Sequence, residues 1–192
     1  MMSAMREFWV FGYGSLMWRP GFDFTWSEPA LIRGYHRALC VLSFVHRGTS
    51  EHPGLVLGLD RGGSCHGMAY RVEAARWEET LAYLRAREQV TSVYLEARKS
   101  VTLRNGGRTV EAIAYLVDRS HRQYAGKLAS GELLRLVRQG RGISGACIDY
   151  VFNTLAHLRD MDIHDARLEA LGEQLAGQAA ASIGEQLAGG IN

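Results

Sequence analysis

Residues 8–16 read FWVFGYGSL, an apolar run that stops at Gly12 and meets a second glycine, Gly14, two residues later. Aromatic and β-branched residues favour a buried strand, and the glycines end that strand in a loop with little side-chain cover. Because glycine has no Cβ atom, the loop can adopt positive φ angles and lets a ligand approach its peptide N–H groups. The stretch therefore predicts a core strand leading into a loop that can bind an anion or a carbonyl oxygen.

The overall composition is that of a globular protein. The chain has 192 residues, enough for one well-filled core, and 47 % of them are hydrophobic. Twenty-two Lys and Arg residues against 20 Asp and Glu give a formal net charge of +2, which favours neither a nucleic-acid nor a membrane partner. No apolar stretch approaches the ~20 residues of a membrane span, and the first residues lack the features of a secretory signal. We therefore expect a cytoplasmic protein.

The cysteines and histidines show no spacing typical of a metal site. Cys40, Cys65 and Cys147 lie far apart and form no CxxC pair, and the seven histidines include no HExxH motif. The glycine loop lacks both the GxGxxG spacing followed by a helix and the lysine of a P-loop. We expect reduced, mostly buried thiols, no metal and no nucleotide site at the glycine loop.

The order of the expected elements predicts an α+β fold. Strands come first and helices last, without regular alternation, which favours a small mixed, mainly antiparallel β-barrel or sheet flanked by helices. An Asn-Gly-Gly turn at 105–107 predicts a tight hairpin. The expected strands are 8–11, 31–44, 55–59, 66–72, 97–103 and 109–117, with a turn at 60–63, and the expected helices are 74–88, 130–139, 144–160 and 165–175.

The C-terminal segment differs from the rest in composition. The sequence GEQLAG occurs at 172–177 and again at 184–189, with alanines between the copies and few large apolar residues. Such a segment can form helix but can bury little surface. We therefore expect a single domain over residues 1–175 and an Ala/Gly-rich peripheral tail over residues 176–192.

One carboxylate lies where an apolar residue is expected. At about 100° per residue, Trp77, Leu81 and Leu84 fall on one stripe of the helix at 74–88, and Glu88 falls in the middle of that stripe. Burial and the negative end of the helix dipole both raise the pKa of a carboxyl group in this position, so Glu88 could accept and return a proton. Alternatively, Glu88 turns outward into water and pairs with an arginine at 85 or 87.

Two other side chains are weaker candidates for chemistry. Ser15 could be a nucleophile with a histidine as base, but the chain has no GxSxG elbow, so Ser15 is expected to hydrogen-bond near the ligand. Tyr150 and Tyr94 are expected to be amphipathic tyrosines whose hydroxyl groups face water.

Taken together, several motifs resemble the ChaC family of γ-glutamylcyclotransferases. They are WVFGYGSLMW at 9–18, GMAYR at 67–71 and the pair Arg87-Glu88, and the similarity spans roughly residues 8–159. The versions RALC at 37–40 and REQVT at 87–91 resemble the bacterial branch. The resemblance implies a small twisted β-barrel or sheet flanked by helices, and an enzyme that releases 5-oxoproline from a γ-glutamyl peptide, typically glutathione, without a metal or coenzyme.

The resemblance also implies roles for individual residues. Glu88 matches the catalytic acid of the family, and the substrate-binding positions match Val10, Phe11, Gly12, Tyr13, Gly14, Ser15 and Tyr150. Two stretches depart from many relatives: residues 142–145 read GISG where these have Gly-Pro-x-Gly, and residues 41–53 differ from the eukaryotic type. Two alternatives therefore stay open: the same reaction on other γ-glutamyl amino acids or amines, or a small-molecule binding module without turnover.

Overall fold

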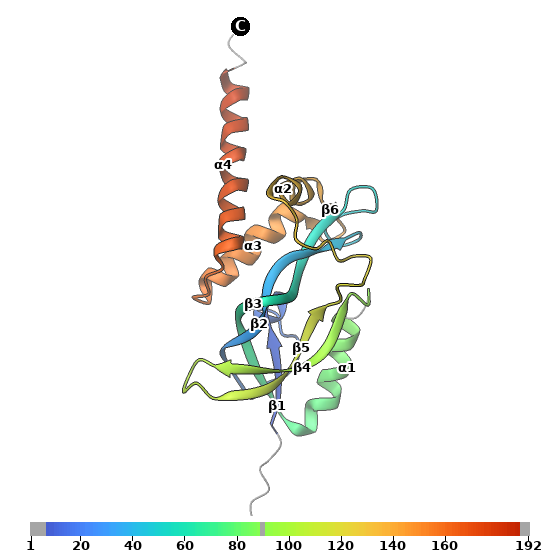
Figure 1. Ribbon diagram of the computed structural model, residues 1–192, viewed down its shortest axis with the longest axis vertical. Coiled ribbons are helices and arrows are strands. Elements are labelled where there is room, and N and C mark those ends of the chain that lie inside the picture. The colour runs from blue at the N-terminus through green and yellow to red at the C-terminus, as the bar shows by residue number, and fades with distance from the viewer. Residues whose placement is uncertain (1–6, 89–90, 189–192) are drawn as a thin grey trace, which may run out of the picture. The chain divides into compact units, whose positions relative to one another are not determined.

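Five strands form a closed barrel, and Figure 1 labels each of them along the chain. They are β1 (Phe8–Gly12), β2 (Trp26–Ser43), β3 (Gly54–Val72), β4 (Tyr94–Leu103) and β5 (Thr109–Val117), and they neighbour one another in the order β1-β3-β2-β4-β5. The β1 strand pairs antiparallel with β3 and parallel with β5, whereas β4 pairs antiparallel with both β2 and β5. The predicted small mixed, mainly antiparallel barrel with helices is confirmed.

The computed structural model describes residues 7–88 and 91–188, and its contacts divide the chain into two units. The barrel unit comprises the described residues up to 42 together with 57–127, and the helical unit comprises 43–56 together with the described residues from 128 onward. In the helical unit, α3 packs against both α2 and α4. Its elements are α2 (Ser130–Gln139), β6 (Arg141–Gly142), β7 (Gly145–Ala146), α3 (Cys147–Asp160) and α4 (Ala166–Ala188).

The C-terminal helix and the expected tail overlap. Helix α4 continues without interruption through residue 176 to Ala188. The division into a domain of residues 1–175 and a tail of residues 176–192 stays a prediction. No helix in the described part of the chain is both long and apolar enough to cross a membrane.

Several expected element boundaries differ from the structure, and two of the differences have a clear physical reason. The turn expected at 60–63 is absent, because β3 runs through these residues as one strand while Gly62 and Gly63 adopt φ angles of 100° and 70° within it. Glycine accommodates such angles without leaving the ladder, as in a β-bulge. The helix expected from residue 144 begins instead at Cys147, because the preceding residues form the β6–β7 ladder.

The barrel core forms around β1 and the helix that follows β3. A 3₁₀ turn, η2 (Ala74–Arg76), leads into α1 (Trp77–Glu88). Trp77, Leu81 and Leu84 are buried, as their periodicity predicts, and they pack with Val10 of β1 and Tyr115 of β5. Because the helix stripe is apolar, its burial fixes the rotation of α1 and therefore the direction in which its last residue points.

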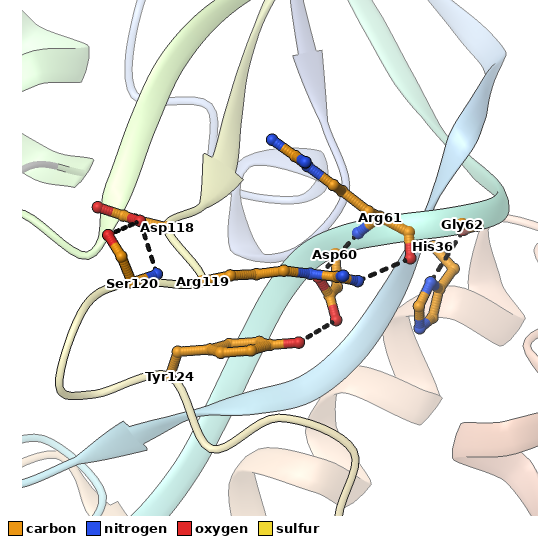
Figure 2. A network of polar contacts seen from close by, with 8 residues as sticks. All are labelled: His36, Asp60, Arg61, Gly62, Asp118, Arg119, Ser120 and Tyr124. Carbon is orange, nitrogen blue, oxygen red and sulfur yellow. Dashed lines mark hydrogen bonds and ion pairs between the residues drawn. The ribbon is translucent and has the colours of Figure 1, made fainter.

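A polar network fastens the chain that follows β5 onto β3, as Figure 2 shows. Arg119 Nε and the Tyr124 hydroxyl donate to opposite oxygens of the Asp60 carboxylate at 2.7 and 2.8 Å, and the Arg61 N–H donates at 2.8 Å. Burial opposes ionisation of Asp60, but the hydrogen bonds from Arg119 and Tyr124 outweigh it and hold the pKa of the carboxyl below its ordinary value. The network thus holds the segment that follows β5 against β3.

Candidate active site

The glycine loop forms a sharp corner at the end of β1. After Gly12 the chain enters a 3₁₀ turn, η1 (Ser15–Met17), in which Met17 N donates to the carbonyl oxygen of Gly14 at 2.9 Å. Positive φ angles were the wrong reason for these glycines, because Gly14 has φ −128° and Gly12 is also outside the left-handed region. Close approach is the actual requirement: a Cβ atom on Gly12 would lie 3.0 Å from the Cβ of Leu16.

Buried side chains hold the carbonyl groups of this loop. Arg37, which is 5 % exposed, donates from Nε to the carbonyl oxygen of Tyr13 at 2.6 Å and from Nη2 to that of His66 at 2.7 Å. The Tyr70 hydroxyl donates to the carbonyl oxygen of Met17 at 2.5 Å, and burial raises the pKa of Tyr70 to about 12. A charged donor and a phenol thus fix the backbone of the loop from the barrel interior.

Two peptide N–H groups of the loop, unlike the carbonyl groups above, have no partner within the described chain. The peptide N–H groups of Gly14 and Ser15 donate to no other residue in the part of the chain that the structure describes. Val10 and Phe11 have fully buried side chains, so only their backbone atoms can reach a ligand. The two N–H groups therefore belong to a backbone that is already held through its carbonyl groups, at one buried residue (Gly14) and one half-buried residue (Ser15).

Glu88 is the last residue of α1, and its side chain is 18 % exposed. Burial raises the pKa of its carboxyl above the ordinary value of 4.5, and the positive charge of Arg87 opposes that rise only in part. Glu88 was expected to be buried on the apolar stripe; it is half-buried, and the shift of its carboxyl pKa has the expected direction. The alternative of an outward, solvated Glu88 does not hold, although the predicted arginine contact exists: Arg87 Nε lies 3.3 Å from Glu88 Oε1.

Arg87 connects this carboxylate to the glycine loop. Its Nη2 donates to Ser15 Oγ at 2.9 Å, so Glu88, Arg87 and Ser15 form one continuous polar chain. Sequence reasoning treated Arg87 only as an ion-pair partner and missed this link. Ser15 Oγ contacts an arginine and not the histidine base that a serine nucleophile requires, which argues against a serine hydrolase.

Tyr115 is a second site neighbour that the sequence did not reveal. It is 1 % exposed on β5, and its hydroxyl donates to Glu96 Oε2 at 3.2 Å. Burial, then the negative charges of Glu96 and Glu88, raise the pKa of Tyr115. Arg85 binds both oxygens of Glu96 at 2.8 Å. In an alternating strand a tyrosine is an ordinary core residue, so nothing local marks its proximity to Glu88.

The remaining predicted residue, Tyr150, belongs to the helical unit. It is half-buried on α3, and the Arg47 guanidinium lies 5.2 Å from the centre of its ring. Within the barrel unit, the structure connects Ser15 to Glu88 through Arg87. Tyr150 belongs to the other unit, and its contacts are described within that unit alone. All three cysteines are buried free thiols. Within residues 7–88 and 91–188, no three His, Cys, Asp or Glu side chains gather as metal ligands.

Comparison with known proteins places these observations in a family context. Residues 8–178 match the model of the family described as ChaC-like protein. The chain is 36 % identical to the glutathione-specific gamma-glutamylcyclotransferase of Escherichia coli (strain K12), over 85 % of this chain and 70 % of the relative. It is 32 % identical to the human glutathione-specific gamma-glutamylcyclotransferase 1, over 88 % of this chain and 81 % of the relative.

A solved structure supports the fold independently. The crystal structure of a gamma-glutamyl cyclotransferase specific to glutathione from yeast superposes with a TM-score of 0.80. The two chains are 23 % identical, and the match covers 89 % of this chain and 96 % of the yeast chain. The barrel with its helices is therefore an established architecture.

Proposed function

The chain belongs to the ChaC-like protein family, and we propose that it cleaves glutathione to 5-oxoproline and Cys-Gly as a γ-glutamylcyclotransferase. The observation that carries this proposal is the partly buried Glu88, whose raised pKa suits proton transfer and which Arg87 joins to Ser15 of the glycine loop. An acid next to a preformed set of N–H donors is the combination that amide cleavage by internal attack requires.

Glu88 manages the protons in this mechanism. The α-amino group of the γ-glutamyl moiety attacks its own γ-carbonyl carbon, so one C–N bond forms while the C–N bond to Cys-Gly breaks. The amino group is an ammonium at neutral pH and has no lone pair until it loses a proton. Glu88 accepts that proton and delivers it to the departing nitrogen. The attacking nitrogen loses a second proton as it becomes the N–H of the lactam, and this proton ends on the released amine of Cys-Gly, which leaves as an ammonium. The reaction involves no change of oxidation state.

The glycine loop stabilises the charge that develops on oxygen. The N–H groups of Gly14 and Ser15 receive the tetrahedral oxyanion, and because the loop is already fixed through its carbonyl groups, little reorganisation is needed. Each such donor contributes roughly 10² to 10³ in rate, and folding the substrate for internal attack adds an entropic advantage. Gly12 and Tyr13 shape the loop, and Val10 and Phe11 anchor it through β1.

The family resemblance supplies the remaining roles. Tyr150 is assigned to substrate contact on that basis, and its half-buried ring leaves part of its surface accessible. A cytoplasmic location also stays a prediction from the sequence.

The test is purified protein incubated with glutathione and followed for 5-oxoproline and Cys-Gly. Glu78, an exposed carboxylate on the same helix, provides the control, since Glu78→Gln removes one charge without touching the site. Wild type and Glu78→Gln are expected to release both products in equal amounts, and Glu88→Gln is expected to release neither. Parallel incubations with γ-glutamyl amino acids and γ-glutamylamines decide whether glutathione is preferred.

A binding module without turnover is the second candidate, and the 3.3 Å contact between Arg87 and Glu88 is the observation in its favour. An arginine that kept Glu88 permanently ionised would prevent it from carrying a proton. Burial outweighs that effect here, so the first candidate is preferred. Thermal stabilisation by glutathione without any 5-oxoproline would reverse this preference.

A further inference from the structure

All three nitrogens of the Arg87 guanidinium have partners, and no two of them share one. Nε faces Glu88 Oε1 at 3.3 Å, Nη2 donates to Ser15 Oγ at 2.9 Å, and Nη1 donates to the Tyr83 hydroxyl at 2.9 Å and to the carbonyl oxygen of Arg19 at 2.6 Å. The side chain is 24 % exposed, so these contacts are shielded in part from water. A planar fork with fixed directions can satisfy them together, whereas a lysine ammonium cannot.

We propose that Arg87 is a positioning residue of the reaction: it holds Ser15 and the glycine loop in register with Glu88 and keeps Glu88 ionised until substrate arrives. This inference rests on the proposed function, because it presupposes that Glu88 carries the proton. It adds a component that acts on the catalytic group and on the loop at once. The contacts to Tyr83 and to the backbone of Arg19 anchor the fork, so that movement of the loop relative to α1 is restricted.

Of the charged groups near Glu88, only Arg87 among the described residues favours the ionised form of its carboxyl group. Tyr115 of β5, whose pKa is raised by burial and by the charges of Glu96 and Glu88, carries no charge at neutral pH, as for any tyrosine. Glu96 of β4 contacts Tyr115, and Arg85 neutralises it through two hydrogen bonds. Among the described residues that face Glu88, Arg87 is thus the cation that opposes the effect of burial. A general base must be ionised before it can accept a proton.

The first test separates the charge of Arg87 from its geometry. In Arg87→Gln, kcat/KM for glutathione at pH 7 is expected to fall roughly tenfold or more, as for loss of a charged hydrogen-bond donor, and the acidic limb of the pH profile moves to higher pH. In Arg87→Lys the charge remains, so the limb stays near its wild-type position, but kcat/KM is still reduced because the fork is lost. The control is Arg76→Gln, which replaces an exposed arginine in the η2 turn before α1 and is expected to keep wild-type values.

The second test asks whether Arg87 acts through Ser15. If it does, Ser15→Ala combined with Arg87→Gln costs less than the product of the two single effects, because both variants remove the same contact. Independent, multiplicative losses would contradict the proposed link. Arg87→Lys with unchanged kcat and KM would contradict it as well, even if Arg87→Gln failed to fold.

A direct titration separates this inference from the proposed function. The Glu88 carboxyl carbon is followed by NMR against pH in wild type and in both Arg87 variants, without substrate. We expect its titration to move to higher pH in Arg87→Gln and not in Arg87→Lys. An unmoved titration in Arg87→Gln, alongside an inactive Glu88→Gln, would overturn the role of Arg87 only. Turnover by Glu88→Gln would overturn the role of Glu88 itself.

Discussion

Replacing Glu88 by glutamine keeps the size of the side chain and removes its ability to accept a proton. General acid–base catalysis contributes roughly 10² to 10⁴ in rate, which corresponds to about 3–5 kcal/mol of transition-state stabilisation. The loss appears in kcat, because the amide can still occupy the same place beside Arg87 and the loop. Steady-state release of 5-oxoproline from glutathione measures kcat, and calorimetry with the inactive variant measures the dissociation constant.

Glu88→Gln lowers activity but is expected to raise stability at neutral pH. The sign of the stability change follows from the direction of the pKa shift of Glu88. The pKa of Glu88 in the folded protein lies above 4.5, so between these two values the folded state binds more protons than the unfolded state. Stability of the wild type therefore falls as pH rises through that window, and the full cost of the buried charge is present above the folded pKa. Glutamine carries no such cost.

The assay is a pair of thermal melts at several pH values from about 4 to 8. We expect the melting temperature of Glu88→Gln minus that of wild type to be close to zero at the acidic end and positive at neutral pH. The loss of the Arg87 contact works against this gain, but burial is the larger effect. A variant that is less stable than wild type at pH 8 and retains turnover would refute both the electrostatic and the catalytic argument.

Three further substitutions test the surroundings of the site. Leu84→Ala removes a fully buried side chain behind Glu88 and is expected to cost about 2–5 kcal/mol in a denaturant melt; a change below 1 kcal/mol would show that the α1 stripe does not anchor the helix. Asp60→Asn is expected to destabilise the protein at neutral pH, and because the folded pKa of Asp60 is lowered, the wild-type advantage disappears as pH falls through that pKa; melts that differ equally at all pH values would contradict this. Gly12→Ala places a Cβ 3.0 Å from that of Leu16, so about 1–3 kcal/mol of stability and most of kcat/KM are expected to be lost; normal turnover would mean that the loop tolerates displacement.

Local features of the chain predicted several parts of the structure correctly. The β4–β5 hairpin has Gly106 and Gly107 at φ angles of 82° and 66°, as an Asn-Gly-Gly turn requires. The α1 stripe is buried at the predicted positions, and β1 ends at the predicted glycine. Each of these features depends on residues close together in sequence, where periodicity and turn chemistry carry the information.

Features that depend on the partner across the barrel could not be predicted in this way. The continuity of β3 through Gly62 and Gly63 is decided by the strands it pairs with, since the same residues in isolation favour a turn. Buried Arg37 is likewise unexpected from local composition, because an arginine in a strand is ordinarily exposed. Its burial makes sense only when the carbonyl groups of Tyr13 and His66 are beside it.

By itself, the sequence determined the α+β class, the glycine loop, a carboxylate on an apolar helix face and the membership of a family. Only the tertiary structure decided that Ser15 and Arg87, 72 residues apart, meet, and that Tyr115 lies close enough to Glu88 to sense its charge. The physical reason is that hydrophobic periodicity fixes which face of an element is buried but not which element covers it. The pairing of strands in the closed barrel decides which elements become neighbours, and it therefore also sets the distance between Glu88 and the glycine loop.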